Sequence, residues 1–288
     1  METQKKLISI VLLNWNGKKL MQKFLPTLIK NSKGIDIYVV DNNSNDDSVR
    51  YLQENFNNVK IIQHKQNSGY AKGYNDAIKN IKTKYLVLIN SDIETTKNWW
   101  QPIIDLMEKK INIAACQPKV LDYNNKNYFE YAGASGGFID LFGYPFCRGR
   151  IFNFLESDKS QYDDDKEVFW ATGACLFIKK SSFDEVNGFD EDYFAHQEEI
   201  DLCWRLKNKG YKIMVCPKSV VYHVGGGTLE KSSSFKTYLN FRNNLLTLYK
   251  NLTRTELIWI LPVRFILDGI AGISFLSRKN GFSHLIAV

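Results

Sequence analysis

Apolar runs alternate with segments of helical period along the first 121 residues. The apolar runs cover residues 7–13, 35–40, 59–63, 84–89 and 113–121, and the helical segments between them cover 18–31, 47–55, 70–81 and 99–109. Runs without polar alternation are typical of strands buried on both faces of a sheet. Strands that alternate with helices at this spacing indicate βαβ units. The pattern therefore predicts an α/β fold with a mostly parallel central sheet flanked by helices.

The pattern changes after Leu121. Residues 123–154 are rich in Gly, Tyr, Phe and Asn, which favours a long surface excursion or a β-hairpin beside a ligand pocket. Strand character returns at 169–179, 211–216 and 220–223, and helices are expected at 194–209, 235–251 and 256–276. We therefore expect one domain over residues 1–230, divided near residue 121, and a C-terminal helical extension over 231–288.

Composition narrows the class of protein. The net charge of +7 comes without a Lys/Arg block, so we expect no nucleic-acid partner and a general attraction to anionic substrates or lipid headgroups. The five cysteines are scattered and form no CxxC pair, which indicates reduced thiols in a cytoplasmic protein and no zinc site. The N-terminal apolar stretch is short and lacks a small-residue cleavage site, so it predicts a first strand and not a signal peptide.

One strand end is a candidate metal site. The apolar run at 85–89 stops on Asn90-Ser91-Asp92. Ligands of open α/β sheets bind at the carboxyl ends of the strands, so Asp92 is expected at that rim. A carboxylate there can hold a divalent metal against a diphosphate. The alternative is that these three polar residues only cap a helix that begins near Lys97.

Three other strand ends have similar chemistry. Leu13 and Trp15 can form an apolar wall for a base, and Asp41 can accept a hydrogen bond from a pyrimidine N–H or a ribose hydroxyl. Glycines within residues 67–75 let a helix N-terminus approach a ligand closely. Each segment alone can be explained as turn and cap chemistry. Four of them at one edge of a sheet predict a nucleotide pocket.

The second half of the chain adds acidic groups. Three of them lie near a predicted helix start: Glu198, Glu199 and Asp201. Their negative charges can interact favourably with the helix dipole, or one of them can act as a general base for a hydroxyl. Residues 163–165 are three consecutive aspartates, which predict a solvated loop, with metal binding as the alternative.

A histidine follows on a late strand. His223 precedes three glycines that leave space around its imidazole. It can bind a metal or donate to a leaving phosphate, although a lone histidine is more often structural.

The C-terminal helix is apolar. Residues 257–276 are long and apolar enough to consider as a membrane span, but Pro262, Arg264 and Asp268 interrupt the run. Trp259 and the basic pair at 278–279 are typical of a helix in the membrane interface. Three placements stay open: contact in the plane of the membrane, packing on the first domain or on a second copy, and a true span. The chain ends within an apolar pattern, as a truncated chain would.

Seven segments together resemble the inverting glycosyltransferases of family 2, which have the GT-A fold, and within them the bacterial rhamnosyltransferase-like branch. They are SIVLLNWNG (9–17), VVDNNSNDDS (39–48), NSGYAKGYN (67–75), LVLINSD (86–92), the segment 171–194 that begins ATGACLF, EEIDLCWRLKNKGYKI (198–213) and YHVGGGT (222–228). The resemblance covers most of the chain and implies that residues 1–121 form the donor half of the domain and 122–230 the acceptor half.

The resemblance also implies roles at matching positions. On the donor side these positions are Leu13, Trp15, Asp41, Asn43, Asn67, Gly69, Asn75, Asn90, Ser91 and Asp92, and on the acceptor side they are Gly173, Ala174 and Asp190. Asp92 takes the last position of the DxD metal motif, whose first position is Asn90 here, and His223 matches a histidine that contacts the metal or the diphosphate. Glu199 matches the base position next to Glu198, but it is longer than the usual Asp, so the choice between Glu199 and Asp201 stays open.

These implications make one hypothesis. The resemblance implies a metal-dependent enzyme, with Mn²⁺ or Mg²⁺ at Asp92 and His223 and a carboxylate general base. The donor would be a UDP- or dTDP-sugar, such as dTDP-rhamnose, and the acceptor a hydroxyl of a cell-surface glycan or of a lipid-linked glycan. We expect a cytoplasmic protein that contacts the inner face of the membrane or forms a homodimer through its C-terminal helices.

Two other functions stay open. A catalytically inactive nucleotide-sugar-binding module is favoured by Asn90 and Glu199, which stand where the family usually has Asp. A sugar-phosphate nucleotidylyltransferase needs a loop rich in glycine and basic residues after the first strand, and NWNGKK (14–19) lacks it.

Overall fold

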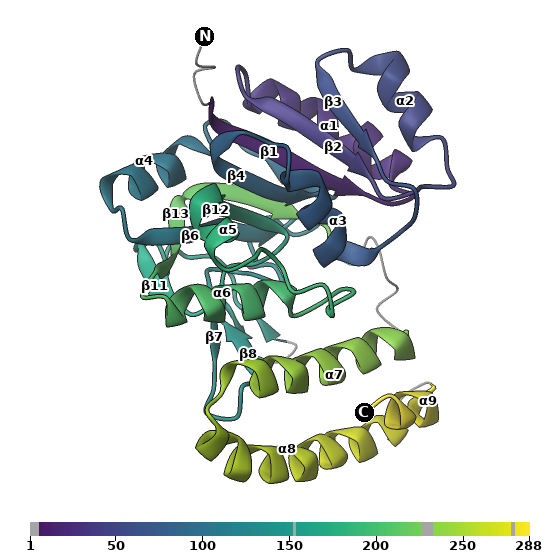
Figure 1. Cartoon of the computed structure of the whole chain (residues 1–288), viewed down its shortest axis with the longest axis vertical. Helices are drawn as coiled ribbons and strands as arrows, with labels where there is room; N and C mark the ends of the chain where they lie inside the picture. The colour runs from purple at the N-terminus through teal and green to yellow at the C-terminus, as the bar shows by residue number, and fades with distance from the viewer. Residues whose placement is uncertain (1–5, 152–153, 226–232, 278–279) are drawn as a thin grey trace.

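The fold is built on one large mixed sheet (Figure 1). The computed structural model describes residues 6–151, 154–225, 233–277 and 280–288. Across the sheet the strands run in the order β11 (Lys166–Val168), β13 (Lys212–His223), β6 (Ile113–Asp122), β12 (Cys175–Lys179), β4 (Thr83–Asn90), β1 (Lys6–Asn14), β2 (Asp36–Asp41) and β3 (Val59–Gln63), and β5 (Ile93–Thr95) pairs with β13. The pairs β3–β2, β2–β1, β1–β4 and β6–β13 are parallel, whereas β12 is antiparallel to both β4 and β6. The predicted mostly parallel sheet is confirmed.

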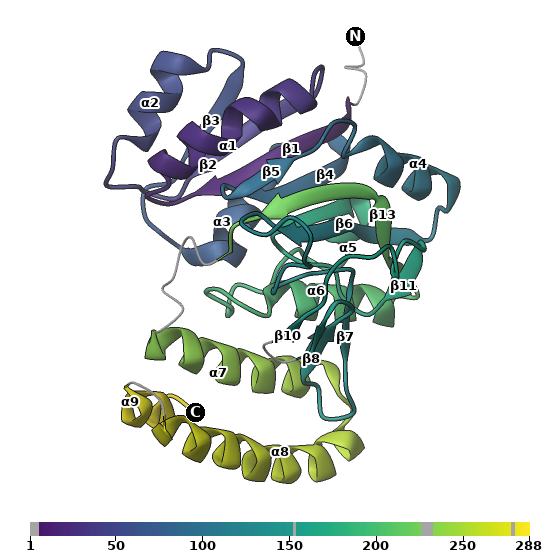
Figure 2. The same cartoon turned by 180° about the vertical axis from the view of Figure 1, so that it is seen from behind.

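Helices cover both faces of this sheet (Figures 1 and 2). One face packs against α1 (Lys18–Asn31), α2 (Ser48–Asn55) and α4 (Gln101–Lys109), and the other against α3 (Gly69–Ile78), α5 (Lys180–Glu185) and α6 (Glu198–Asn208). Along β1, Ile10 and Leu12 pack on the first face and Val11 on the second, and all three are almost fully buried. Burial on both sides explains why the strands appear in the sequence as unbroken apolar runs.

The predicted surface excursion is a small antiparallel sheet. It consists of β7 (Gly137–Ile139), β8 (Pro145–Cys147), β9 (Arg150–Ile151) and β10 (Phe154–Leu155). The acidic loop that follows is held by ion pairs with buried or half-buried cations. Lys119, 4% exposed, pairs with Asp158 and Asp163, and Arg148 pairs with Asp164. All three consecutive aspartates, 163–165, are exposed, as expected of a solvated loop, and within the described residues they belong to no cluster that could hold a metal.

Three predicted boundaries are wrong for identifiable reasons. The helix expected from residue 194 begins at Glu198, because His196 and Gln197 adopt left-handed φ angles of 71° and 72°. The strands expected at 211–216 and 220–223 are one strand, β13, with an irregularity between Cys216 and Val220. Asp92 is followed by β5, and α4 begins only at Gln101, so the helix-capping alternative for residues 90–92 is also wrong.

The C-terminal extension forms a separate layer below α6 (Figure 1). It contains α7 (Ser234–Asn251), α8 (Arg254–Ser274), a short 3₁₀ turn at Phe275–Ser277 and α9 (Gly281–Ile286). Helix α8 buries every fourth residue, Ile260, Arg264, Asp268 and Gly272, and turns most of its apolar side chains outward. Within the described residues, 254–277 is the one helical segment long and apolar enough to cross a membrane, with a mean hydropathy of 1.7. The basic pair Arg278–Lys279 lies outside the described residues.

Candidate active site

A cavity of about 480 Å³ opens at the carboxyl ends of β1 and β4. Its volume is typical of small-molecule sites. The predicted site residues that line it are Leu13, Trp15, Asn67, Gly69, Asn90, Ser91, Asp92, Gly173, Ala174, Glu198, Glu199 and His223. The structure thus brings the carboxylates of the second half of the chain into the same cavity as the strand ends of the first half.

Asp92 and His223 face each other in this cavity. His223 ends β13, which pairs with β5, and this pairing sets His223 opposite Ile93, the residue after Asp92. His223 Nε2 lies 3.1 Å from Asp92 Oδ1, and His223 Nδ1 lies 3.3 Å from Glu130 Oε1. The three residues are at most 5% exposed. Sequence reasoning missed Glu130, because residues 123–154 show no period that would mark one side chain as inward-facing.

The two carboxylates control the charge of this imidazole. Burial disfavours the charged ring, but Asp92 and Glu130 outweigh burial and raise the pKa of His223 to about 10. Burial alone would raise the pKa of Asp92, but the attraction of His223 outweighs burial and lowers this pKa. The site therefore holds a buried cation between two acidic side chains at neutral pH.

The donor side of the cavity is formed by the ends of β1 and β2 and the start of α3. Asn42 Nδ2 donates to Asn67 Oδ1 (2.9 Å) and to the carbonyl oxygen of Gly69 (3.0 Å). Gly69 has a φ of +81°, and a Cβ there would lie 2.4 Å from the carbonyl oxygen of Phe194, so the close approach requires glycine. Asn42 was not predicted. Its neighbour Asp41 offered the stronger chemical signal in the same polar run.

Several predicted residues do not line the cavity. Asp41 is buried and accepts from Asn14 Nδ2 (3.1 Å) and the Ser44 amide (3.0 Å). Asn75 exchanges two hydrogen bonds with the backbone of Phe189, at 2.8 and 3.0 Å. Asn43 is exposed in a left-handed conformation, and Asp190 pairs with Lys250. Asp41, Asn75 and Asp190 therefore hold neighbouring segments of the chain together.

Glu198 and Glu199 begin α6 and line the same cavity. The Oε2 atom of each is buried without a hydrogen-bond partner among the described residues. Burial raises the pKa of both carboxyls, and the proximity of Glu199 raises the pKa of Glu198 further. Tyr70 on α3 donates to the carbonyl oxygen of Gly173 (2.7 Å) and also lines the cavity.

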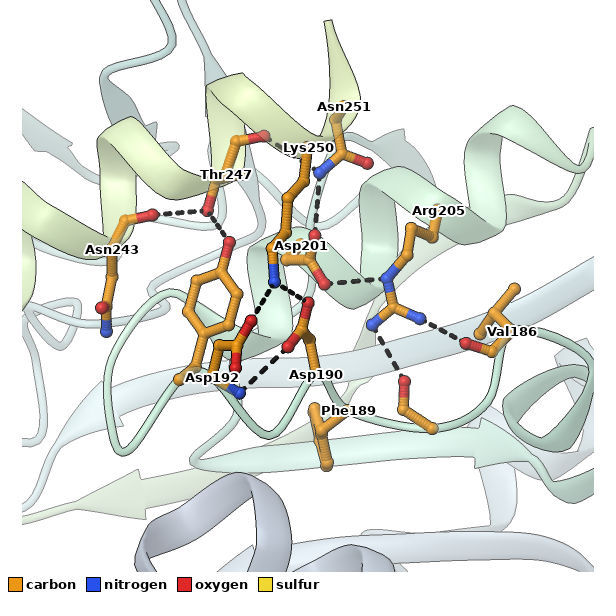
Figure 3. Close-up of polar contacts among 12 residues, drawn as sticks. Val186, Phe189, Asp190, Asp192, Asp201, Arg205, Asn243, Thr247, Lys250 and Asn251 are labelled. Atoms are coloured by element: carbon orange, nitrogen blue, oxygen red, sulfur yellow. Dashed lines mark hydrogen bonds and ion pairs between the residues drawn. The ribbon is translucent and has the colours of Figure 1, made fainter.

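Asp201 has a different environment. Its side chain is fully buried and accepts from Arg205 Nε and from Asn251 Nδ2, each at 2.8 Å (Figure 3). Both carboxylate oxygens are therefore used between α6 and α7, and Asp201 does not line the cavity. Aromatic and basic residues that sequence reasoning missed line the rim instead: Phe194, His196, Phe235 and Lys236. The last two belong to α7, which the sequence marked only as an additional helix.

The chain matches a known protein family. Residues 9–187, more than half of the chain, match the family model described as glycosyl transferase family 2. The chain belongs to glycosyltransferase family 2. It is 22% identical over 232 residues to the N-acetylglucosaminyl-diphospho-decaprenol L-rhamnosyltransferase of Mycobacterium tuberculosis, covering 75% of each chain. It is 24% identical over 226 residues to the rhamnosyltransferase WbbL of Escherichia coli, covering 75% of this chain and 83% of WbbL.

Solved glycosyltransferase structures share the fold. GalNAc-T7 with UDP, GalNAc and Mn²⁺ superposes with a TM-score of 0.66 at 16% identity, covering 86% of this chain and 48% of that one. Residues 1–349 of TarS from S. aureus, in complex with UDP, superpose with a TM-score of 0.59 at 16% identity, covering 95% of this chain and 75% of that one. The predicted GT-A fold and the predicted likeness to rhamnosyltransferases are confirmed.

Proposed function

We propose that this family 2 glycosyltransferase moves a sugar from a nucleotide-diphosphate donor to an acceptor hydroxyl with inversion at the anomeric carbon. The observation that supports this most is the shared cavity: the Asp92–His223 pair lies at the strand ends, and the pair Glu198–Glu199 lines the same space. A leaving diphosphate at the first pair and an attacking hydroxyl at the second are the two requirements of a single in-line displacement.

The Asp92–His223 pair can hold a divalent metal, Mn²⁺ or Mg²⁺, if the metal displaces the proton that His223 otherwise carries at neutral pH, because only a neutral imidazole is a ligand. The 3.1 Å between Asp92 Oδ1 and His223 Nε2 is close to the separation of adjacent ligands on an octahedral Mg²⁺, about 3 Å for bonds of about 2.1 Å. Among the described residues no cluster of three or more His, Cys, Asp or Glu forms a closed metal site. Oxygens of the donor diphosphate and water molecules would supply the remaining ligands, as is usual for Mg²⁺. When bound, such a metal neutralises charge on the leaving diphosphate.

Glu199 is the better candidate for the general base. Because burial raises its pKa, its carboxylate binds a proton more strongly than an ordinary glutamate and can take one from the acceptor hydroxyl. Asp201 keeps both oxygens in contacts with Arg205 and Asn251, so its approach to an acceptor would break a buried ion pair. We therefore assign the base role to Glu199, with Glu198 beside it.

Donor and acceptor are proposed from the relatives. Two of them are named as rhamnosyltransferases, one acting on a diphospho-decaprenol-linked sugar, and TarS was solved with UDP. We propose a UDP- or dTDP-sugar donor, such as dTDP-rhamnose, and a cell-surface or lipid-linked glycan acceptor. The outward apolar face of α8 then lies on the inner face of the cytoplasmic membrane, where a lipid-linked acceptor is found, and dimerisation through α8 is the alternative.

A catalytically inactive binding module is the second candidate function. The observation that favours it is Asn90, which leaves one carboxylate fewer beside Asp92 than a DxD motif would supply. We expect a panel of nucleotide sugars to contain at least one donor that raises the unfolding temperature. With that donor and Mn²⁺ or Mg²⁺, the enzyme should release free sugar even without an acceptor. Stabilisation without sugar release under either metal would favour the binding module.

A further inference from the structure

Helix α7 holds the segment that leads into α6. Three α7 side chains one turn apart contact this segment or the first turn of α6: Asn243, Thr247 and Asn251. Figure 3 shows the contact between Asn251 and Asp201. Thr247 shares a hydrogen bond of 2.8 Å with Tyr193, and Asn251 donates to Asp201 at 2.8 Å. Residues between these two contact points include Glu198 and Glu199. The polar face of α7 therefore spans the stretch that delivers the carboxylate pair to the cavity.

Asn243 makes the contacts nearest to the carboxylates. It is fully buried, and its Nδ2 donates to the carbonyl oxygens of Ala195 (2.8 Å) and His196 (2.7 Å). Its Oδ1 accepts from Arg242 Nε at 2.8 Å, which fixes the orientation of the amide. All three hydrogen-bonding groups of this side chain thus have partners, and two of them restrain consecutive peptide units just before α6.

The restrained turn is an unfavourable one. His196 and Gln197 both have left-handed φ angles, which residues with a Cβ adopt rarely and which persist only where the surroundings enforce them. Gln197 directly precedes Glu198, and its carbonyl oxygen accepts the amides of Ile200 (3.1 Å) and Asp201 (3.0 Å), the first hydrogen bonds of α6. If the turn relaxes, the start of α6 and the direction of both glutamates change with it.

We infer that Asn243 is a positioning residue for the Glu198–Glu199 pair, acting through the His196–Gln197 turn, so that the C-terminal extension is part of the catalytic apparatus. The inference rests on the proposed function for what the carboxylates do, but the restraint itself is independent of it. The family match ends at residue 187, so it includes neither α7 nor the carboxylate pair.

A second contact extends the restraint to α8. Asn244 Nδ2 lies 3.3 Å from Gln197 Oε1 and 2.9 Å from the carbonyl oxygen of Gly143. Its Oδ1 accepts from Arg264 of α8, which is 1% exposed and pairs with Asp268 at 3.0 Å. The buried Arg264–Asp268 ion pair therefore fixes the side-chain amide of Asn244, which in turn contacts the side chain of Gln197.

The variants for the test are Asn243→Ala and the isosteric Asn243→Asp, both of which remove the two donations. The matched control is Asn240→Ala, because Asn240 lies on the same helix and, among the described residues, donates only to the carbonyl oxygen of Lys236 in its own helix (2.9 Å). Hydrogen exchange of the full chain, followed by mass spectrometry on peptides covering 194–202, reports the amides of Ile200 and Asp201 without any substrate. Sugar release with the donor selected by thermal shift gives kcat and donor KM.

We expect both Asn243 variants to speed hydrogen exchange in peptides covering 194–202 at least tenfold and to leave exchange in peptides from β4 and β13 unchanged. We also expect both variants to lower kcat at least tenfold, with the donor KM within twofold of that of the wild type. Asn240→Ala should leave both quantities unchanged. Exchange equal to that of the control would overturn the inference, as would equal losses in kcat and donor affinity. Loss of cooperative unfolding in both variants would also overturn it, since Asn243 would then support the whole fold. A wild type that releases no sugar refutes the proposed function, and the exchange result still decides the role of Asn243.

Discussion

The three acidic residues at the start of α6 differ in environment more than in chemistry. Within the part of the chain that the structure describes, Glu198 and Glu199 each have a buried oxygen without a hydrogen-bond partner, whereas both oxygens of Asp201 accept hydrogen bonds from Arg205 and Asn251. A carboxylate without compensating donors in a buried site has a raised pKa and is a stronger base. Environment therefore separates residues that the sequence alone left as equal candidates.

The pH dependence of turnover follows from this burial. Since the folded pKa of Glu199 is raised, its basic form is lost as the pH falls through that raised value, so the acidic limb of kcat should lie above the ordinary range of glutamate, about 4.3. Other titratable groups near it are Glu198 and Cys203 on α6, Tyr70 on α3 and Cys147 on β8.

Glu199→Gln should lower kcat about 10²- to 10⁴-fold, the usual contribution of a general base, and leave donor affinity unchanged. Rate profiles between pH 4 and 9, together with donor binding by calorimetry, measure both effects. Asp201→Asn serves as the comparison, because it should lower the unfolding temperature by weakening the contact with Arg205 and Asn251. An E199Q enzyme with near-normal turnover would assign the base role elsewhere.

Residues at strand ends were predictable from the sequence, and residues in irregular segments were not. Asp92 and His223 each follow an apolar run, and parallel strands bring such ends to one edge of the sheet. Glu130 and Asn42 lie where several polar residues are equally plausible, and only the folded chain shows which one points inward. His196 and Gln197 have no local signal for a left-handed turn, because the restraint comes from α7, about 47 residues later.

The helices and strands that were predicted correctly are those with a strong hydrophobic pattern in the sequence. The apolar runs of β1 and β4 and the amphipathic α1 were predicted to within one or two residues. The three-residue β5 and the six-residue α5 were missed, because neither is long enough to show a clear period. The apolar composition of α8 was evident from the sequence, but the face that it turns toward the protein was not. The buried ion pair places the polar residues of α8 against the protein and leaves many of its apolar residues exposed.

The outward face of α8 should bind lipid. Between Leu257 and Ser277 it exposes no charged side chain, and Phe265, Ile266 and Ile270 are each more than half exposed. Burying such surface in a bilayer interface is favourable by about 25 cal/mol per Å². We expect the wild type to sediment with vesicles that contain phosphatidylglycerol, and the double variant Phe265→Asp, Ile270→Asp to stay in solution.

Ile111→Asp is the control for this experiment, because Ile111 is 82% exposed at the far end of α4 and its loss should not affect sedimentation. Light scattering on the same samples separates the alternative. A wild type that ignores vesicles and is dimeric, with a monomeric double variant, would show that α8 binds a second copy of the chain and not lipid.

The whole molecule assembles its cavity from distant parts of the chain. Strand β12 inserts antiparallel between β4 and β6, and the Asn90 amide donates to the carbonyl oxygen of Ala174 at 2.9 Å. This insertion joins the donor strands to the segment around Gly173, while α7 supplies Phe235 and Lys236 to the rim. The order of strands and this layer of helices depend on long-range packing, which no local pattern in the sequence encodes.

The central claim is that Asp92, which lines the same cavity as the Glu198–Glu199 pair, would hold a divalent metal that neutralises charge on the leaving diphosphate. The most direct test is sugar release from the selected donor with saturating Mn²⁺, compared between the wild type, Asp92→Asn and the control Asp105→Asn, whose residue is exposed on α4. We expect D92N to lose turnover by roughly 10²- to 10³-fold, the range for removing one group that stabilises developing charge, and D105N to match the wild type. Turnover by D92N within a few-fold of the wild type would contradict this account.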